Sequence, residues 1–194
     1  AGSIVSEMVK QIAIYKPQRL ILVDEAETPM HDVRLFMNKN YADIPCETIV
    51  TSITNATRME RIFSEYHPDY VFHAAAYKHV PMMEDNPSEA VQNNVYGTRV
   101  IADMAVKYGT RKFVMISTDK AVNPTNVMGC SKRICEIYCQ ALNKAIVDGE
   151  VKGVTQFVTT RFGNVLGSNG SVIPIFKKQI AMGGPITVTH PDII

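Results

Sequence analysis

Short apolar segments alternate with amphipathic segments along almost the whole chain, and this alternation restricts the possible folds more than any other feature. Apolar, β-branched runs are typical of strands buried on both faces, and the segments between them have helical periodicity. The pattern predicts strands at residues 19–23, 47–50, 70–73, 112–116 and 155–160. It predicts helices at residues 4–15, 30–38, 56–66, 87–108, 127–146 and 171–182. Such alternation predicts an α/β fold, a Rossmann-like doubly wound parallel sheet.

No linker, repeat or low-complexity segment divides the 194 residues, so we predict one domain over residues 1–194. The chain opens on helical sequence with no strand before it, and residues 187–192 end as a strand runs into a loop. We therefore expect a fragment of a longer protein, whose sheet lacks its first strand and which lacks a C-terminal subdomain.

Composition excludes several classes of partner. The formal net charge is +1, which gives no electrostatic footprint for nucleic acid. No apolar run approaches the roughly 18 residues of a membrane span, and no signal peptide is visible. The four cysteines lack paired metal-ligand spacing, so we expect no metal site. Cys135 and Cys139, four apart in a predicted helix, are interpreted as small buried side chains, and a reducing, cytoplasmic setting fits.

Residues that follow the first predicted strands suit a dinucleotide. A Gly2-Ser3 turn at a helix N-terminus lets backbone N–H groups approach a pyrophosphate, although Val5 stands where a third small residue would be expected. Asp24 ends the next strand, where an acid can accept hydrogen bonds from the adenosine ribose. A carboxylate there would repel a 2′-phosphate, so NAD is favoured over NADP; a solvent-facing loop acid is the alternative.

Two further strand ends belong to the same prediction. Ser52 and Ile53 follow the third strand of such a sheet, where an adenine edge would lie. Ala74, Ala75 and Ala76 follow the fourth, where small side chains let a cofactor pass close to the strand end, unless they simply pack against a helix.

The groups with acid–base chemistry follow the strand at residues 112–116. Thr118, Asp119 and Lys120 place a hydroxyl, a carboxylate and an ammonium at the carboxyl end of that strand, unless they form only a solvated turn. Lys132 lies four residues after Met128 on one face of the next helix and could hydrogen-bond a nicotinamide ribose. Asn94, on another helix, could orient Lys132 through a carbonyl or a water.

Five longer motifs resemble one family specifically, the polysaccharide-biosynthesis branch of the extended short-chain dehydrogenases/reductases, which are capsular UDP-N-acetylglucosamine 4,6-dehydratases. The resemblance covers essentially the whole chain. The motifs are FHAAAYKHVP at 72–81, EDNP at 84–87, NNVYGT at 93–98, STDKAVNPTNVMG at 117–129 and RFGNVLGS at 161–168.

The resemblance implies a lyase with a redox cycle on a bound nicotinamide cofactor, which yields a UDP-4-keto-6-deoxy N-acetyl sugar. In that cycle Thr118 would hydrogen-bond the 4-oxygen and Asp119 would protonate the leaving 6-hydroxyl. Lys120 would take the C5 proton, which requires burial or the nearby Lys132 charge to favour the neutral amine. Lys78, His79 and Asn164 would contact the sugar and pyrophosphate, although Lys78 could equally be a surface lysine.

Met128 departs from the commoner short-chain pattern, which has tyrosine there. A thioether has no proton to exchange, so Met128 cannot be the base at the 4-hydroxyl. Similar membrane-anchored members also have methionine, with Asp119 or water inferred to move this proton, and they resemble C5-retaining enzymes. Arg161 is interpreted as the structural partner of an acid.

Three alternatives remain open on the sequence. A UDP-sugar epimerase shares the fold and most motifs. A non-catalytic NAD-binding module would agree with the missing first strand, Val5 and the missing tyrosine. An inactive truncation of an active enzyme is the third. We expect a UDP-sugar as ligand, a homo-oligomer, and a cytoplasmic location, with the longer parent anchored at the inner membrane.

Overall fold

The computed structural model describes residues 2–165 and 172–187. Residues 188–192 of the last expected strand, and residues 166–168 of the fifth motif, lie outside this part of the chain.

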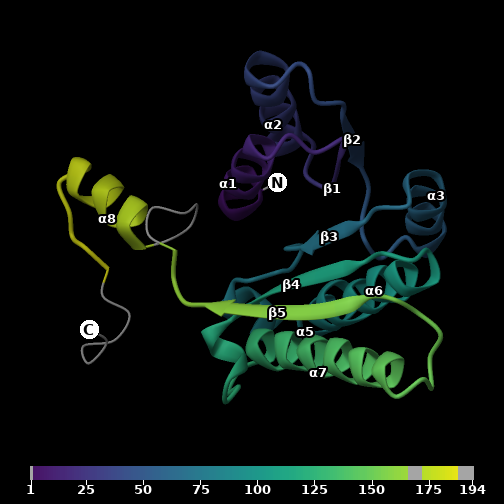
Figure 1. Ribbon diagram of the computed structural model, residues 1–194. Coiled ribbons are helices and arrows are strands. Elements are labelled where there is room, and N and C mark those ends of the chain that lie inside the picture. Colours follow the sequence, from purple (N-terminus) through teal and green to yellow (C-terminus); the bar gives the residue numbers. More distant parts are fainter. Residues whose placement is uncertain (1, 166–171, 188–194) are drawn as a thin grey trace.

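The strands are all parallel, as predicted, and form two groups (Figure 1). In one group β1 (Leu20–Asp24) pairs with β2 (Cys46–Val50). In the other, β4 (Lys112–Thr118) lies between β3 (Tyr70–His73) and β5 (Gln156–Phe162). The carboxyl ends of β3, β4 and β5 therefore meet at one edge, which is where an open α/β sheet binds its ligand.

The division into two groups agrees with a sheet that lacks its first strand. In the doubly wound order 3-2-1-4-5-6 the first strand lies at the centre, between the strands that correspond here to β1 and β3. Among the described residues no hydrogen-bonded ladder joins β1 to β3. The prediction of a Rossmann-like parallel fold is thus confirmed, with the sheet interrupted at its centre.

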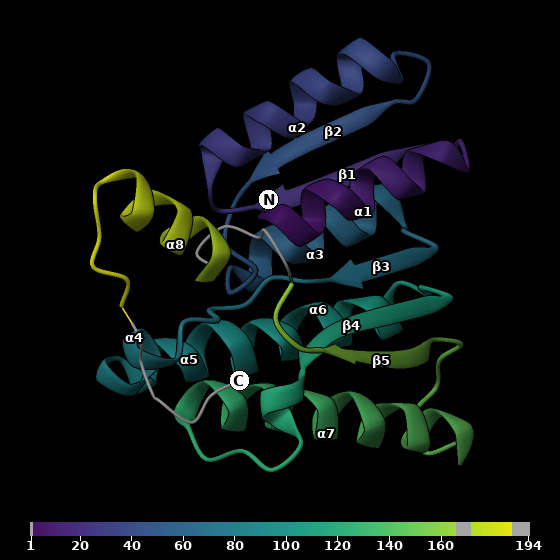
Figure 2. The same cartoon turned by 90° about the vertical axis from the view of Figure 1, so that its left-hand side faces the viewer.

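Helices lie between the strands at nearly the predicted positions (Figures 1 and 2). Their bounds are α1 Ser3–Ile14, α2 Glu27–Asn40, α3 Ala56–Tyr66, α4 Val80–Asp85, α5 Pro87–Ala90, α6 Gly97–Lys107, α7 Val127–Val147 and α8 Val172–Ala181. In the described part of the chain, no helix has both the length and the apolar character needed to cross a membrane.

Two apolar clusters cover opposite faces of β1 and β2. Val9 of α1 and Met37 of α2 pack with Leu20 and Leu22 of β1. The alternate residue Ile21 instead packs into the larger cluster, which α3, α6 and α7 form with β3, β4 and β5. Side chains alternate across a strand, so β1 is covered on both faces, whereas Phe72 of β3 and Val158 of β5 point away from the larger cluster and are exposed.

The predicted helix at residues 87–108 is interrupted by a π-helical segment, η1 (Val91–Tyr96), between α5 and α6. A π-helix is wider than an α-helix, and such segments often occur at functional sites. The buried side chains of Asn93 and Asn94 both belong to it. Neither this segment nor the short helix α4 that precedes it was predicted from the sequence.

Candidate active site

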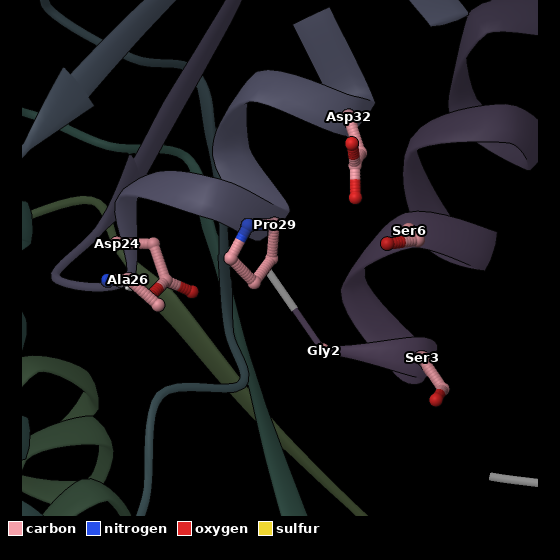
Figure 3. Close-up of a pocket in the computed structure, with 7 residues that line it drawn as sticks. All are labelled: Gly2, Ser3, Ser6, Asp24, Ala26, Pro29 and Asp32. Carbon is pink, nitrogen blue, oxygen red and sulfur yellow. Dashed lines mark hydrogen bonds between the residues drawn. The ribbon is translucent and has the colours of Figure 1, made fainter. Parts of the chain in front are cut away.

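A pocket of about 460 Å³ lies beside the first turn of α1, between that helix and the end of β1 (Figure 3). This volume lies within the range of roughly 300–1,000 Å³ typical of small-molecule sites. Its lining residues are Gly2, Ser3, Ser6, Asp24, Ala26, Pro29 and Asp32. Three predicted cofactor residues, Gly2, Ser3 and Asp24, are thereby brought together.

Asp24 ends β1, and its Oδ1 accepts a hydrogen bond of 2.8 Å from the Ala26 backbone N–H. This bond fixes the turn after the strand and leaves the carboxylate at the pocket wall (Figure 3). Asp32, from α2, adds a second carboxylate to the same pocket, and Ser6 adds a hydroxyl. Neither was predicted. A helical i, i+3 spacing from Ser3 and a second acid after Asp24 were the available signals.

The other predicted cofactor residues lie at the ends of β2 and β3. Ser52 Oγ is 2.9 Å from Thr54 Oγ1, in the turn before α3. Ile53 is buried in the larger apolar cluster and touches Gly97, so its side chain packs in the core. Ala74, Ala75 and Ala76 are half-buried directly after β3. Any cofactor contact by Ile53 would have to come from its backbone.

Thr118, Asp119 and Lys120 form one hydrogen-bonded group where β4 runs into a 3-10 turn, η2 (Asp119–Ala121). The Thr118 hydroxyl donates to Asp119 Oδ1 over 2.8 Å, and Lys120 Nζ lies 3.2 Å from the same oxygen. The hydrogen bond from Thr118 is the largest cause that lowers the pKa of Asp119, with Lys120 adding to it. Asp119 is therefore ionised near neutral pH and can accept a proton.

Lys132 is a buried cation in α7, with 5% of its surface exposed. In the described part of the chain its ammonium makes no hydrogen bond or ion pair. Burial lowers the pKa of Lys132, and burial together with the Lys132 charge lowers the pKa of His73 to about 3, so His73 is neutral. A buried lysine without a partner marks a candidate ligand contact.

Asn94 is a buried side chain that uses all of its hydrogen-bonding capacity. Its Nδ2 donates to the Tyr77 carbonyl (3.1 Å) and to Ser131 Oγ (2.9 Å), and its Oδ1 accepts from the backbone N–H of Tyr77 (2.8 Å) and from Asn93 (3.1 Å). It thereby ties the loop after β3 to α7, at the residue before Lys132. Among the described residues no hydrogen bond joins Asn94 to the Lys132 ammonium, so the Asn94 side chain reaches α7 only at Ser131, the residue before Lys132.

Met128 is 4% exposed and packs with Met83 and Ala90 in a small apolar cluster, with Tyr77 against it. The Tyr77 hydroxyl donates a hydrogen bond of 3.2 Å to Glu25, the residue after β1. The side chain at position 128 is thus held by apolar packing.

The three predicted substrate contacts are exposed and lie on two loops. Lys78 and His79 lie between β3 and α4, and Asn164 follows β5. A Cβ added at Gly163 would lie 3.4 Å from Asp119 Oδ2, so the Asn164 loop begins beside the Asp119 carboxylate. The acidic partner expected for Arg161 is Glu136 of α7. Within the described residues, no group of three or more potential ligands could hold a metal ion.

Known proteins that are similar to this chain identify its family. A family model described as "Polysaccharide biosynthesis protein" matches residues 1–194. The chain belongs to this family. It is 48% identical over 193 residues to the capsular polysaccharide biosynthesis protein CapD of Staphylococcus aureus, covering 99% of this chain and 31% of CapD. The sequence-based assignment to the polysaccharide-biosynthesis branch of the extended short-chain dehydrogenases/reductases is therefore confirmed.

Other relatives differ in their reactions. The chain is 35% identical over 179 residues to the UDP-N-acetylglucosamine 4,6-dehydratase (inverting) of Campylobacter jejuni, covering 91% of this chain and 51% of that protein. UDP-glucose 4-epimerases are also similar. Among solved structures, the dTDP-glucose 4,6-dehydratase DesIV of Streptomyces venezuelae, with NAD and TYD bound, superposes with a TM-score of 0.77 at 22% identity, covering 96% of this chain and 61% of DesIV. The chain thus spans a third to about three fifths of these proteins.

Proposed function

We propose that this chain contains the cofactor site and the acid–base groups of a UDP-N-acetylglucosamine 4,6-dehydratase that works in the cytoplasm with NAD. The observation that supports this most directly is the group of Thr118, Asp119 and Lys120 at the carboxyl end of β4. The dehydratase relatives at 35% identity support the reaction and the sugar.

The residues present fit a nicotinamide dinucleotide. Gly2 leaves the space at the start of α1 open, because a Cβ there would meet nothing within 4 Å. Asp24 offers an acceptor at the pocket wall, and Lys132 offers a buried cation whose charge acts on His73, the last residue of β3. When bound, the cofactor would accept a hydride from C4 of the sugar and return it to C6.

Asp119 would take the proton of the sugar 4-hydroxyl, which the thioether of Met128 cannot accept. As a carboxylate it takes the O4 proton while C4 is oxidised to a ketone, with the Thr118 hydroxyl hydrogen-bonded to O4. Asp119 is then the acid required at the next step, and it gives that same proton to the leaving 6-hydroxyl. The water released contains the original O4 proton, so Asp119 ends each cycle ionised.

Lys120 would take the C5 proton, which the adjacent 4-ketone makes acidic. As a base it must first have lost its own proton to solvent. Protonation of Asp119 removes the negative charge that lies 3.2 Å from the amine, which releases Lys120 from its ion pair when C5 reacts. After water has left, Lys120 returns the proton to C5. Because one residue removes and returns this proton from one face, we propose that the configuration at C5 is retained.

Asp24 sets the preference for NAD, and we expect Asp24→Ser to reduce it. The carboxylate would accept hydrogen bonds from the ribose hydroxyls and repel a 2′-phosphate, and such charged hydrogen bonds contribute about 1.5–3 kcal/mol. The ratio of the NADP and NAD dissociation constants should fall by about tenfold or more. Isothermal titration measures both constants, with Asp43→Asn, an exposed acid between α2 and β2, as the control. An unchanged ratio would contradict this role.

Met128→Tyr tests whether methionine disables the site. The side chain packs tightly against Met83 and Ala90, so we expect overpacking that destabilises the fold by about 1–3 kcal/mol, without a gain in kcat. Thermal unfolding and initial rates measure the two effects. A large gain in rate would show that the enzyme lacks a base at O4, and would overturn the role of Asp119 in that step.

The reaction itself is tested by mass spectrometry of UDP-N-acetylglucosamine after incubation with NAD and the full-length protein. A product lighter by one water supports the dehydratase. An unchanged mass with an altered sugar configuration would support an epimerase, a reaction that the UDP-glucose 4-epimerase relatives favour. An unchanged sugar, with NAD still bound, would mean a binding module or a different sugar.

A further inference from the structure

A cluster of charged side chains around one buried carboxylate lies on the side of the sheet that α7 covers. Glu136 of α7 has none of its surface exposed. Its carboxylate accepts hydrogen bonds from Arg161 of β5, over 2.8 Å from Nε and 2.5 Å from Nη2. Arg133, one turn back on α7, donates a third over 2.9 Å. The Arg161 contact is bidentate, the geometry with the greatest directional specificity.

The cluster remains charged. Burial opposes ionisation of Glu136, but the hydrogen bonds, chiefly that from Arg161, outweigh it and lower the pKa of Glu136 to about 2. A buried ion pair contributes little net stability compared with apolar packing, because desolvation offsets the attraction. Its directional hydrogen bonds do, however, fix the relative position of the two elements that they join.

The bidentate pair joins the two elements nearest the proposed chemistry. Arg161 lies two residues before Gly163, where the end of β5 passes beside the Asp119 carboxylate. Glu136 lies four residues after Lys132, so the two share a face of α7. The register of α7 along β5 therefore sets where the Lys132 ammonium lies relative to the end of β4.

A second contact holds the same helix near its start. A Cβ added at Gly129 would collide with the backbone carbonyl oxygen of Lys120, so the first turn of α7 rests directly on η2. Lys132 lies between Gly129 and Glu136 along the helix. The helix is thus fixed on both sides of its cofactor lysine, to η2 at one point and to β5 at the other.

We propose that Glu136 is a positioning residue, which through Arg161 holds α7 in the register that sets where Lys132 lies relative to the carboxyl end of β4. This inference rests on the proposed function, because it assigns Glu136 a part in that reaction. Glu136 itself would touch neither the substrate nor the cofactor.

The test compares three variants of the full-length protein. Glu136→Gln removes the negative charge of the pair. Arg161→Lys keeps the positive charge but loses the bidentate geometry. The second variant keeps the proposal testable if Glu136→Gln does not fold. Arg133→Lys is the matched control, because Arg133 belongs to α7 and, among the described residues, its side chain bonds only to Glu136 of the same helix. Each variant is assayed well below its unfolding temperature for kcat, KM and NAD dissociation constant, and by amide hydrogen exchange over residues 128–133 and 161–165.

We expect kcat to fall about 10- to 100-fold in Glu136→Gln and Arg161→Lys, as small misplacements of reacting groups do. KM and the NAD dissociation constant should stay within about threefold. Exchange should quicken in both segments, and Arg133→Lys should resemble the wild type in every measurement. A purely structural pair would lower the unfolding temperature and leave kcat of the folded protein unchanged, and that result overturns the proposal.

Failure of the proposed dehydratase function can be distinguished from failure of the positioning role. In that case the wild-type protein leaves the sugar unchanged, and the exchange pattern decides the positioning of α7. Faster exchange in Glu136→Gln and Arg161→Lys, but not in Arg133→Lys, would support a register fixed by this pair. Equal exchange in all three variants would overturn it.

Discussion

Replacing Asp119 with asparagine is expected to lower kcat by about 100- to 10,000-fold, the contribution typical of a positioned acid or base. Asparagine keeps the size of the side chain and can still accept the hydrogen bonds from Thr118 and Lys120. It cannot take or give a proton. In the mechanism proposed here one carboxylate serves two steps, so both C4 oxidation and loss of water should stop.

The reacted sugar shows which step fails. Quenching the mixture with borohydride traps any 4-keto sugar as a pair of C4 epimers, and mass spectrometry counts the dehydrated product. With Asp119→Asn neither species should form, whereas Asp43→Asn, an exposed acid far along the chain, should behave as the wild type. Thermal unfolding of both variants should be similar, because Asp119 is itself mostly exposed. Accumulation of the trapped 4-keto sugar would show that water, and not Asp119, takes the O4 proton.

The strands and most helices were predictable because each has a strong local signal. The apolar runs at residues 70–73 and 112–116 lie at the positions of β3 and β4, although β4 continues through Thr118. Thr118 was therefore expected after the strand and is its last residue. Periodicity does not mark such an end, since a polar residue can close a strand or begin a turn.

Features that depend on tertiary contacts were missed. The π-helical segment at Val91–Tyr96 has an ordinary helical sequence. The hydrogen bonds that accompany its wider turn run from Asn94 to Tyr77 and Ser131, which are distant in sequence, so helical periodicity does not reveal it. α4 is only six residues long, too short for periodicity to reveal.

The sequence indicated the residues of the candidate site better than it indicated the contacts between them. Motif resemblance and strand ends indicated Asp24, Thr118, Asp119 and Lys120, and the structure brings the last three into one hydrogen-bonded group. Glu136 was not singled out, although an acid four residues after Lys132 on the same helix face was the available signal, together with Arg161 directly after the predicted strand at residues 155–160. Nothing in a single sequence shows that these two residues meet.

Replacing Lys120 with methionine is expected to separate the two halves of the reaction. Methionine is a similarly long, flexible side chain without a proton acceptor strong enough to remove the C5 proton. Asp119 and Thr118 remain, so C4 can still be oxidised and the 4-keto sugar should accumulate. Formation of the dehydrated product should fall by about 100-fold or more. Lys152→Met, at an exposed lysine before β5, is the matched control.

Exchange of the C5 hydrogen with solvent tests the role of Lys120 more specifically than a rate measurement alone. In deuterated water the wild-type protein should introduce deuterium at C5, because the lysine amine that holds the C5 proton exchanges with solvent. With Lys120→Met the trapped 4-keto sugar should contain no deuterium at C5. If deuterium appears there at the wild-type rate, another group removes the proton, and Lys120 would then serve only as the ion-pair partner that keeps Asp119 ionised. Loss of both the 4-keto sugar and the product would place Lys120 in the oxidation step, because without its ammonium the Asp119 carboxylate would not be held where it can take the O4 proton.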